Sequence, residues 1–380
     1  MALETRTIST GLILGGYMLS ANQKITPRQL QILMILHALG VGLIVLPRRV
    51  AGFADYNGWM IVLGLTVIAL IVALLITSIS RIFPSQSFIA YTGRVLTKPV
   101  AYLAGIGLLG KLLFSAGMEL RIFSIITKQF LLRNTPSIVI CAVMVALAAF
   151  LAGKGIETRA RIAEILFFIV MIPLIALLIL AFFDINLKNL LPVMDVKPRQ
   201  VLEGSLRLGY IFSGLECLLL VHVFINRPKQ MRRAVLSVIP WIGLLLFTIT
   251  AVTLAKFGND ISGQEWSVIR MMDNLYLPGA FVERKESLVM SFWIVSVFLI
   301  LGMILFYGGM LMKDMKSPAR GGINIVVCAV IIFVLSCLPF SADRIFELLD
   351  WVYYTFGLFY LLVLPLVIII VARLRKGVSE

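Results

Sequence analysis

The fold is decided by residues 27–47, which read PRQLQILMILHALGVGLIVLP. This run is apolar and long enough to cross the roughly 30 Å hydrocarbon core of a bilayer as a helix, but Gly40, Val41 and Gly42 interrupt it. A glycine inside a helix costs about 1 kcal/mol relative to alanine. The run therefore predicts a membrane-spanning helix that is broken at mid-depth, where the exposed backbone groups need a ligand, water or protein as partners.

Similar apolar blocks recur along the whole chain. Of the 380 residues, 60% are hydrophobic and only 14% are charged, whereas about 25% are charged in a typical globular protein. Charged residues, prolines and glycines separate these blocks into ten predicted spans. The spans cover approximately residues 28–53, 58–80, 99–130, 137–153, 160–183, 205–225, 233–255, 285–312, 322–339 and 345–372. The sequence thus predicts an all-α integral membrane protein and excludes a soluble enzyme.

The ten spans divide into two groups of five, and an odd number forces the second group to enter the membrane from the opposite side. Such five-plus-five inverted repeats occur in many secondary transporters, whose binding sites lie where corresponding helices are broken. The sixth span carries Ser213-Gly214 at the place that matches Gly40–Gly42 in the first span. We therefore expect the first and sixth helices to be broken. The alternative is that these glycines only allow close packing of helices.

The predicted organisation is one membrane domain with short ends. Residues 1–24 are expected to form a flexible or interfacial leader, residues 25–376 the ten-helix permease-like domain, and residues 377–380 a tail. Within the domain, the first repeat covers about residues 28–183 and the second about residues 205–372.

The net charge of +15 comes from 34 lysines and arginines against 19 acidic residues. When the N-terminus is placed inside, most of the basic residues fall in inner segments, as the positive-inside rule requires. Both termini are then cytoplasmic. Nearly all of the excess positive charge lies on that inner face, where it attracts anionic lipids of the bilayer. A nucleic-acid partner is not needed to explain the charge.

A series of short motifs runs from residue 25 to residue 293. They are Ile25–Leu30 with Gly40–Leu43 and Leu46-Pro47, Trp59, Phe83-Pro84, Gly155–Glu164, Asn189–Val193, Phe212–Glu216, Glu283–Leu288 and Trp293. Each motif is weak alone. In this order, on ten spans, the chain resembles the B subunits of spore germinant receptors. These endospore germination permeases belong to the amino acid–polyamine–organocation transporter superfamily.

The resemblance implies a LeuT-like fold and a germinant-recognising subunit in the inner membrane of a bacterial spore. Its ligand would be a small nutrient, either an amino acid or in some cases a sugar or a nucleoside. Its partners would be a membrane-anchored A-type subunit and a lipoprotein C-type subunit. The rival interpretation is an amino acid transporter driven by H⁺ or Na⁺, and the fold alone does not separate the two functions.

Few charged residues lie inside the predicted spans, and each is a candidate for function because a charge at mid-bilayer costs several kcal/mol. Lys111, Ser115 and Glu119 are spaced four residues apart and form one stripe on the third helix. Glu119 either lines a polar cavity that holds a ligand amine, a proton or water, or it braces Lys111. Glu216 follows the second break by two residues and either joins this polar network or hydrogen-bonds the freed backbone.

The predicted ligand site combines the two breaks with this stripe. The carboxylate of an amino acid would meet the amides freed in the first span, at the positive end of a half-helix. The ligand side chain would meet apolar groups of the sixth span. The predicted substrate-binding residues are Gly40, Val41, Gly42, Phe212, Ser213, Gly214, Leu215, Glu119 and Ser115. The predicted polar network or gate consists of Lys111, Glu216 and Tyr307.

Neither a metal nor another cofactor is expected. The four cysteines form no Cys-x-x-Cys pair, and the only two histidines lie in apolar spans. Without a Ser/His/Asp set or paired carboxylates in a soluble cleft, we do not expect an enzyme. Sodium-coupled relatives place a Ser/Thr pair on the eighth span near the first break, whereas Ser287, Ser291 and Ser296 are isolated here.

Overall fold

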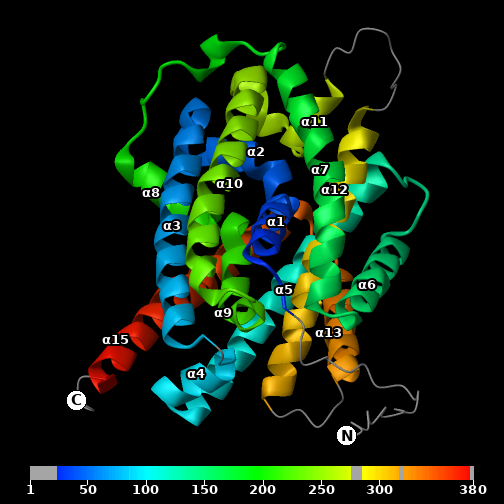
Figure 1. Cartoon of the computed structure of the whole chain (residues 1–380). Coiled ribbons are helices and arrows are strands. Elements are labelled where there is room, and N and C mark those ends of the chain that lie inside the picture. Colours follow the sequence, from blue (N-terminus) through cyan, green and yellow to red (C-terminus); the bar gives the residue numbers. More distant parts are fainter. Residues whose placement is uncertain (1–23, 85, 275–284, 316–320, 377–380) are drawn as a thin grey trace, which may run out of the picture.

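The computed structural model describes residues 24–84, 86–274, 285–315 and 321–376. Within these ranges the chain is almost entirely helical and contains no strand (Figure 1). The predicted leader, apart from Lys24, and the predicted tail lie outside the described residues.

The first half of the chain forms seven α-helices. They are α1 (Pro27–Ala38), α2 (Val41–Ala54), α3 (Trp59–Ile82), α4 (Phe88–Val95), α5 (Lys98–Phe130), α6 (Ser137–Gly153) and α7 (Ile156–Phe182). Two short 3₁₀ turns, η1 (Asp55–Asn57) and η2 (Leu187–Leu190), also belong to this half.

The second half begins with a span that is mostly 3₁₀ helix. It consists of α8 (Pro198–Arg207), η3 (Leu208–Cys217), α9 (Leu218–Val221) and η4 (His222–Phe224). The helices that follow are α10 (Pro228–Phe257), η5 (Gly258–Gly263), α11 (Ser267–Asp273), α12 (Lys285–Asp314), α13 (Gly321–Ser336), α14 (Ala342–Val352) and α15 (Leu364–Lys376). Two π-helical turns, Tyr353–Gly357 and Phe359–Val363, join α14 to α15.

Six stretches of the described chain are long and apolar enough to cross a membrane. They are Trp59–Ile82, Lys98–Phe130, Ile156–Phe182, Pro228–Gly263, Met290–Asp314 and Ala342–Leu374. The number rises to eight when each of two bent helix pairs counts as one span. α6 and α13 are shorter apolar helices at the places predicted for the fourth and ninth spans. The count of ten spans stays a prediction.

The outer surface of the helix bundle is apolar. Leu103, Ile106, Phe150 and Ile172 are each more than half exposed, although water would disfavour such a surface. Hydrocarbon does not, so this surface is the one a bilayer would cover.

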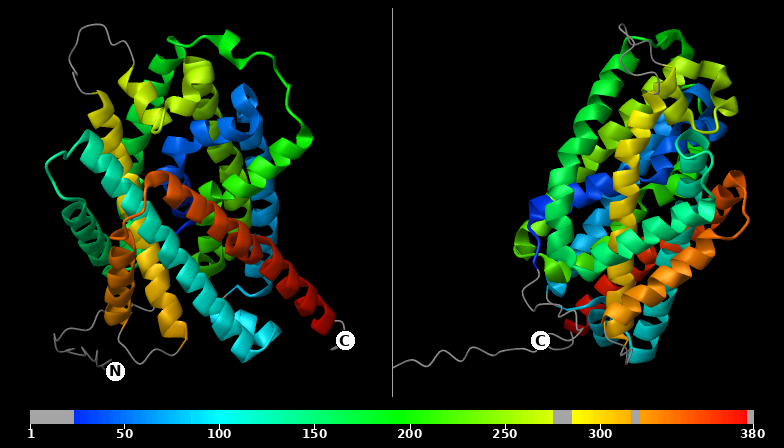
Figure 2. Two further views of the ribbon diagram at one scale, coloured as in Figure 1. Left: turned by 180° about the vertical axis from the view of Figure 1, so that it is seen from behind. Right: turned by 90° about the vertical axis from the view of Figure 1, so that its right-hand side faces the viewer.

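The bundle has two ends, which we name by the short helices that lie there. One end, the α4 side, contains α4, the start of α10 and the end of α15 (Figures 1 and 2). The opposite end, the α11 side, contains η5 and α11. α5 runs between the two ends and finishes at the α11 side.

The first break separates α1 from α2. α1 starts with a capping box, in which the Gln29 amide donates to Thr26 Oγ1 (3.2 Å) and the Thr26 amide donates to Gln29 Oε1 (2.9 Å). It ends at Ala38, and α2 starts after Gly40, whose backbone is extended. The two helices are bent by 57°. The break therefore lies at residues 39–40, and Gly42, which we had expected within it, is helical.

The second break has a different form. Residues 198–212 and 214–224 are bent by 53°, and at the bend Phe212 leaves helical backbone angles (φ −97°, ψ 19°). The sixth helix is thus broken at Ser213-Gly214, as expected, although tight 3₁₀ turns continue through the bend.

Backbone hydrogen bonds join the two broken spans at the α4 side. The Ile25 amide donates to the Phe224 carbonyl (2.8 Å), and the Asn226 amide donates to the Ile25 carbonyl (3.0 Å). Lys24 Nζ also donates to the Val223 carbonyl (2.8 Å). The start of the first span is thus tied to the end of the sixth.

Candidate functional site

The two breaks lie against each other, and glycines make this approach possible. A Cβ atom at Gly214 would lie 2.5 Å from His37 Cδ2, closer than real side chains approach. A Cβ at Gly42 would lie 3.1 Å from Ile211 Cγ1, and one at Gly40 would lie 2.9 Å from Ile300 Cδ1 of α12. Close packing and broken helices, which the sequence left as alternatives, therefore occur together.

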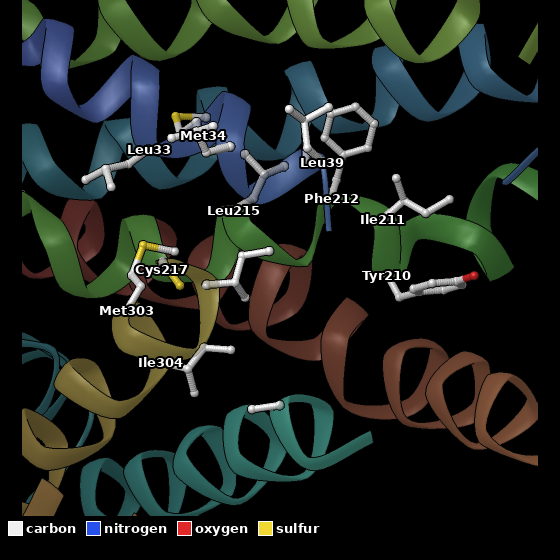
Figure 3. Close-up of a cluster of buried hydrophobic side chains, with 14 of the residues drawn as sticks. Leu33, Met34, Leu39, Tyr210, Ile211, Phe212, Leu215, Cys217, Met303 and Ile304 are labelled. Atoms are coloured by element: carbon white, nitrogen blue, oxygen red, sulfur yellow. The ribbon is translucent and has the colours of Figure 1, made fainter. Parts of the chain in front are cut away.

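A small cavity of about 20 Å³ lies between the breaks. Its lining is Met34, His37, Ala38, Ile211, Phe212, Gly214, Leu215 and Ile242. Figure 3 shows how apolar side chains of α1 and η3 gather there. The one titratable group is His37, whose Nδ1 is buried and has no hydrogen-bond partner in the described chain. The cavity is thus apolar with a single polar atom to offer.

A second cavity, of about 40 Å³, lies on the other side of the first break. It is lined by Leu39, Leu43, Ile44, Val170, Leu174, Leu177, Val268, Phe292, Trp293 and Ser296. Trp293 Nε1 and Ser296 Oγ are both buried without a hydrogen-bond partner among the described residues. In the sequence, Ser296 is only an isolated serine and Trp293 only a motif residue. Their unpaired polar atoms beside the break could not be seen in the sequence.

Neither cavity has room for a nutrient molecule. A water molecule needs about 10–15 Å³ of such volume, whereas sites for drug-sized ligands measure roughly 300–1,000 Å³. The structure is therefore a closed state with space for a few waters, and a larger ligand requires the two breaks to separate.

A buried ion pair lies next to the second break. Lys111 Nζ of α5 donates to Glu216 Oε1 of η3, and both side chains are almost completely buried. The ammonium also faces the ring of Tyr353 at 5.9 Å. Glu216 Oε2 has no partner in the described ranges. Lys111 thus pairs across helices with Glu216, and not with Glu119 on its own helix.

The other predicted polar residues lie on α5 and α12. Glu119 and Ser115 are half-buried on α5, and within the part of the chain described here Glu119 forms no ion pair. Tyr307 is buried on α12, its ring 5.6 Å from that of Phe306. The side chains of Val41 and Ser213 lie outside the described residues. The described residues contain no group of three or more His, Cys, Asp or Glu that could hold a metal.

Arg159 is a site residue that the sequence analysis missed. The sequence places it in the loop before a fifth span starting at residue 160, but α7 begins at Ile156 and Arg159 is only 1% exposed. Its guanidinium lies over the ring of Phe306 at 4.7 Å. All three of its nitrogens are buried without a partner among described residues. Arg159 belongs to the motif Gly155–Glu164, but a basic residue next to a predicted span indicates only which side of the membrane the loop faces.

Ion pairs close the bundle at the α11 side. Arg49 of α2 pairs with Asp350 of α14, and both side chains are largely buried. Arg48 Nη1 lies 3.5 Å from Asp343 Oδ1, and its Nε donates to the Ser262 carbonyl (3.1 Å). The α2 half of the first span is therefore tied to α14.

A helical bundle with two broken spans in contact at its centre has the architecture of a transporter-like fold. Solved transporter structures share this fold. The chain matches the structure of MhsT in complex with L-phenylalanine with a TM-score of 0.64 at 13% identity, over 93% of this chain and 99% of that chain. It matches a Na⁺-coupled sialic acid symporter with a TM-score of 0.64 at 10% identity, over 89% of this chain and 77% of that chain. The predicted LeuT-like fold class is confirmed.

The family profile described as "Spore germination protein" matches residues 24–345, and the chain belongs to this spore permease family. Spore germination protein YndE of Bacillus subtilis is 29% identical over 94% of this chain and 99% of its own length. Spore germination protein A2 of the same organism is 25% identical over 90% and 93%. GerLB of Bacillus cereus is 25% identical over 89% and 91%. The predicted family is confirmed, and the chain is an integral membrane protein.

Proposed function

We propose that this chain recognises a small nutrient, an amino acid, at the two breaks and passes the signal to A-type and C-type partner subunits of a spore germinant receptor. The observation that carries this proposal is the direct contact between the two broken spans through Gly214 and His37. A ligand that enters there must separate the breaks. Binding is therefore coupled to movement of the two spans, which is what a receptor needs.

The ligand would use both ends of this site. Its carboxylate would meet the first amides of α2, because Gly40 supplies no side chain to cap them and the half-helix offers a positive dipole end. Its side chain would meet Phe212 and Leu215. Such a lining suits a small apolar amino acid. In this proposal the α4 side faces the spore interior, and both termini are cytoplasmic.

The second candidate is a secondary transporter that moves an amino acid with H⁺ or Na⁺. Two observations favour it. Ser296 Oγ beside the first break has no hydrogen-bond partner among the described residues, and one solved structure with the same fold is a Na⁺-coupled symporter. Purified protein in proteoliposomes separates the candidates. A receptor binds labelled amino acids without accumulating them, whereas a transporter accumulates them when a Na⁺ or H⁺ gradient is applied.

Glu119→Gln is expected to impair the nutrient response while protein abundance in the membrane stays normal. Glu119 is a half-buried carboxylate without an ion-pair partner in the described ranges, so it has little packing role to lose. Glu119→Leu should impair the response further, because it also removes hydrogen bonding to water or ligand. Subunit level and germination response are measured in the same spores. A normal response per molecule in both variants would show that Glu119 has no role in recognition.

Asp350→Asn is expected to loosen the α11 side. The variant leaves Arg49 without its carboxylate partner in a largely buried place, where a pair contributes more than at the surface. A cysteine at position 211, in a chain lacking its native cysteines, should then react with an added thiol reagent about fivefold faster, the ratio that about 1 kcal/mol gives.

The matched control is Asp343→Asn on the same helix. Asp343 is 75% exposed and lies 3.5 Å from Arg48, so its loss should leave the labelling rate unchanged. Equal rates in the two variants would argue against a closing role for the Arg49–Asp350 pair.

A further inference from the structure

A polar pocket of about 330 Å³ opens at the α11 side, between the end of α5, η5 and α11. Its volume lies in the range of small-molecule sites and is many times that of either break cavity. The side chains that line it are those of Gln129, Gln264, Glu265, Trp266, Arg270 and Asn274. The lining brings a carboxylate, a guanidinium and three carboxamides to one place.

The pocket offers one group of each charge. Glu265 forms no ion pair in the described part of the chain and can accept hydrogen bonds from an ammonium group. The Arg270 guanidinium lies over the ring of Phe130 at 5.4 Å. Its Nη1 is 3.9 Å from Asp273 Oδ2, which is too far for a hydrogen bond. It can therefore bind a carboxylate with two parallel hydrogen bonds. Carboxamides supply further donors and acceptors at the rim.

Trp266 forms the floor of the pocket and is fixed in place. Its side chain is 1% exposed, and its Nε1 donates to Gln129 Oε1 (2.9 Å). Because the indole N–H is already used and the ring is covered, the accessible lining of the pocket is mainly polar.

We infer that this pocket is an accessory binding site for a free zwitterionic amino acid, with the ammonium group at Glu265 and the carboxylate at Arg270. The site is separate from the breaks and does not depend on the function proposed for them.

The same short helix forms a wall of the pocket and a wall of the 40 Å³ cavity. Trp266 and Arg270 face the pocket, whereas Val268 lines the cavity beside the first break. Ser267 Oγ donates to the Ile44 carbonyl of α2 (3.2 Å). A solute held between Glu265 and Arg270 therefore spans the turn that carries this contact with α2. Occupancy of the accessory site would influence how readily the first break opens.

The test uses the purified full-length protein in nanodiscs and equilibrium binding of five labelled amino acids: glycine, L-alanine, L-valine, L-asparagine and L-phenylalanine. At least one should show a saturable component that Arg270→Gln and Glu265→Gln each weaken about tenfold or more, because each variant removes a charged hydrogen-bonding partner. The amide and N-acetyl derivatives of that amino acid, which lack the carboxylate and the ammonium group respectively, should fail to displace it.

The control is Arg344→Gln on α14, which removes one positive charge from an exposed ion pair with Glu347 (2.8 Å) outside the pocket. This variant should bind like the wild type. Amino acid binding at the breaks would appear as a second component that persists in Arg270→Gln and Glu265→Gln. If the breaks bind no amino acid, only this second component is missing. The inference is overturned if no amino acid binds, if both pocket variants keep all components, or if Arg344→Gln causes the same loss. It is also overturned if D-glucose or inosine displaces the component instead.

Discussion

Lys111→Ala should destabilise the protein by about 3–5 kcal/mol, because it leaves the Glu216 carboxylate buried without its partner. Glu216→Ala should cost a similar amount, since the ammonium of Lys111 is then left among apolar groups. Thermal unfolding of the purified protein in detergent measures the effect. Arg161→Ala breaks a pair with Glu157 whose side chains are 70% and 40% exposed, so it should cost no more than about 1 kcal/mol.

A double variant separates stability from function. Lys111→Met with Glu216→Leu replaces the pair by apolar groups of similar size, a change that is often neutral or stabilising. We expect its thermal stability to return to the wild-type range. If the double variant also gives a normal nutrient response, the pair only stabilises the fold. If the response stays absent, the charges take part in recognition. Single variants as stable as the wild type would contradict the buried pairing itself.

Gly214→Ala is expected to cost about 1–3 kcal/mol and to reduce ligand binding, because the new methyl group would lie 2.5 Å from His37 Cδ2. The imidazole is held between the two breaks and has little room to move. Gly110→Ala on α5 is the matched control. No atom lies within 4 Å of its Cβ position, so this change should raise helix stability by up to about 1 kcal/mol.

The reason for the cost can be tested with a second substitution. His37→Ala removes the ring that the new methyl group meets, so the double variant with Gly214→Ala should recover much of the lost stability. Unfolding midpoints of the four proteins form a double-mutant cycle. Additive effects would show that the two residues do not press on each other.

The spans of this fold could be predicted closely from the sequence, because a bilayer imposes a simple rule on any backbone that crosses it. The fourth span was predicted at residues 137–153, which are the bounds of α6. The first break was found within two residues, because Gly40 is required by the close approach of Ile300. The fifth span was placed four residues late. The apolar block begins after Arg159, but the helix already begins at Ile156.

The contents of the candidate site were harder to predict. Lys111 and Glu216 are separated by 105 residues, and a stripe on one helix says nothing of which neighbouring helix supplies the partner. The burial of Arg159 depends on Phe306 from α12, again a tertiary contact. α11 was expected only as part of a connecting loop. Its seven residues show no long apolar run, although they touch both the pocket and the first break.

The joint between residues 25 and 225 has a consequence for how this protein can change in evolution. Its two hydrogen bonds join main-chain atoms only, so replacing either isoleucine with another residue leaves the donors and acceptors in place. Proline is the exception, because at position 25 or 226 it would remove one of the two N–H groups. The side chains at residues 25 and 225 can therefore change while the two spans stay linked. Because of this link, the first and sixth spans must move together at the α4 side.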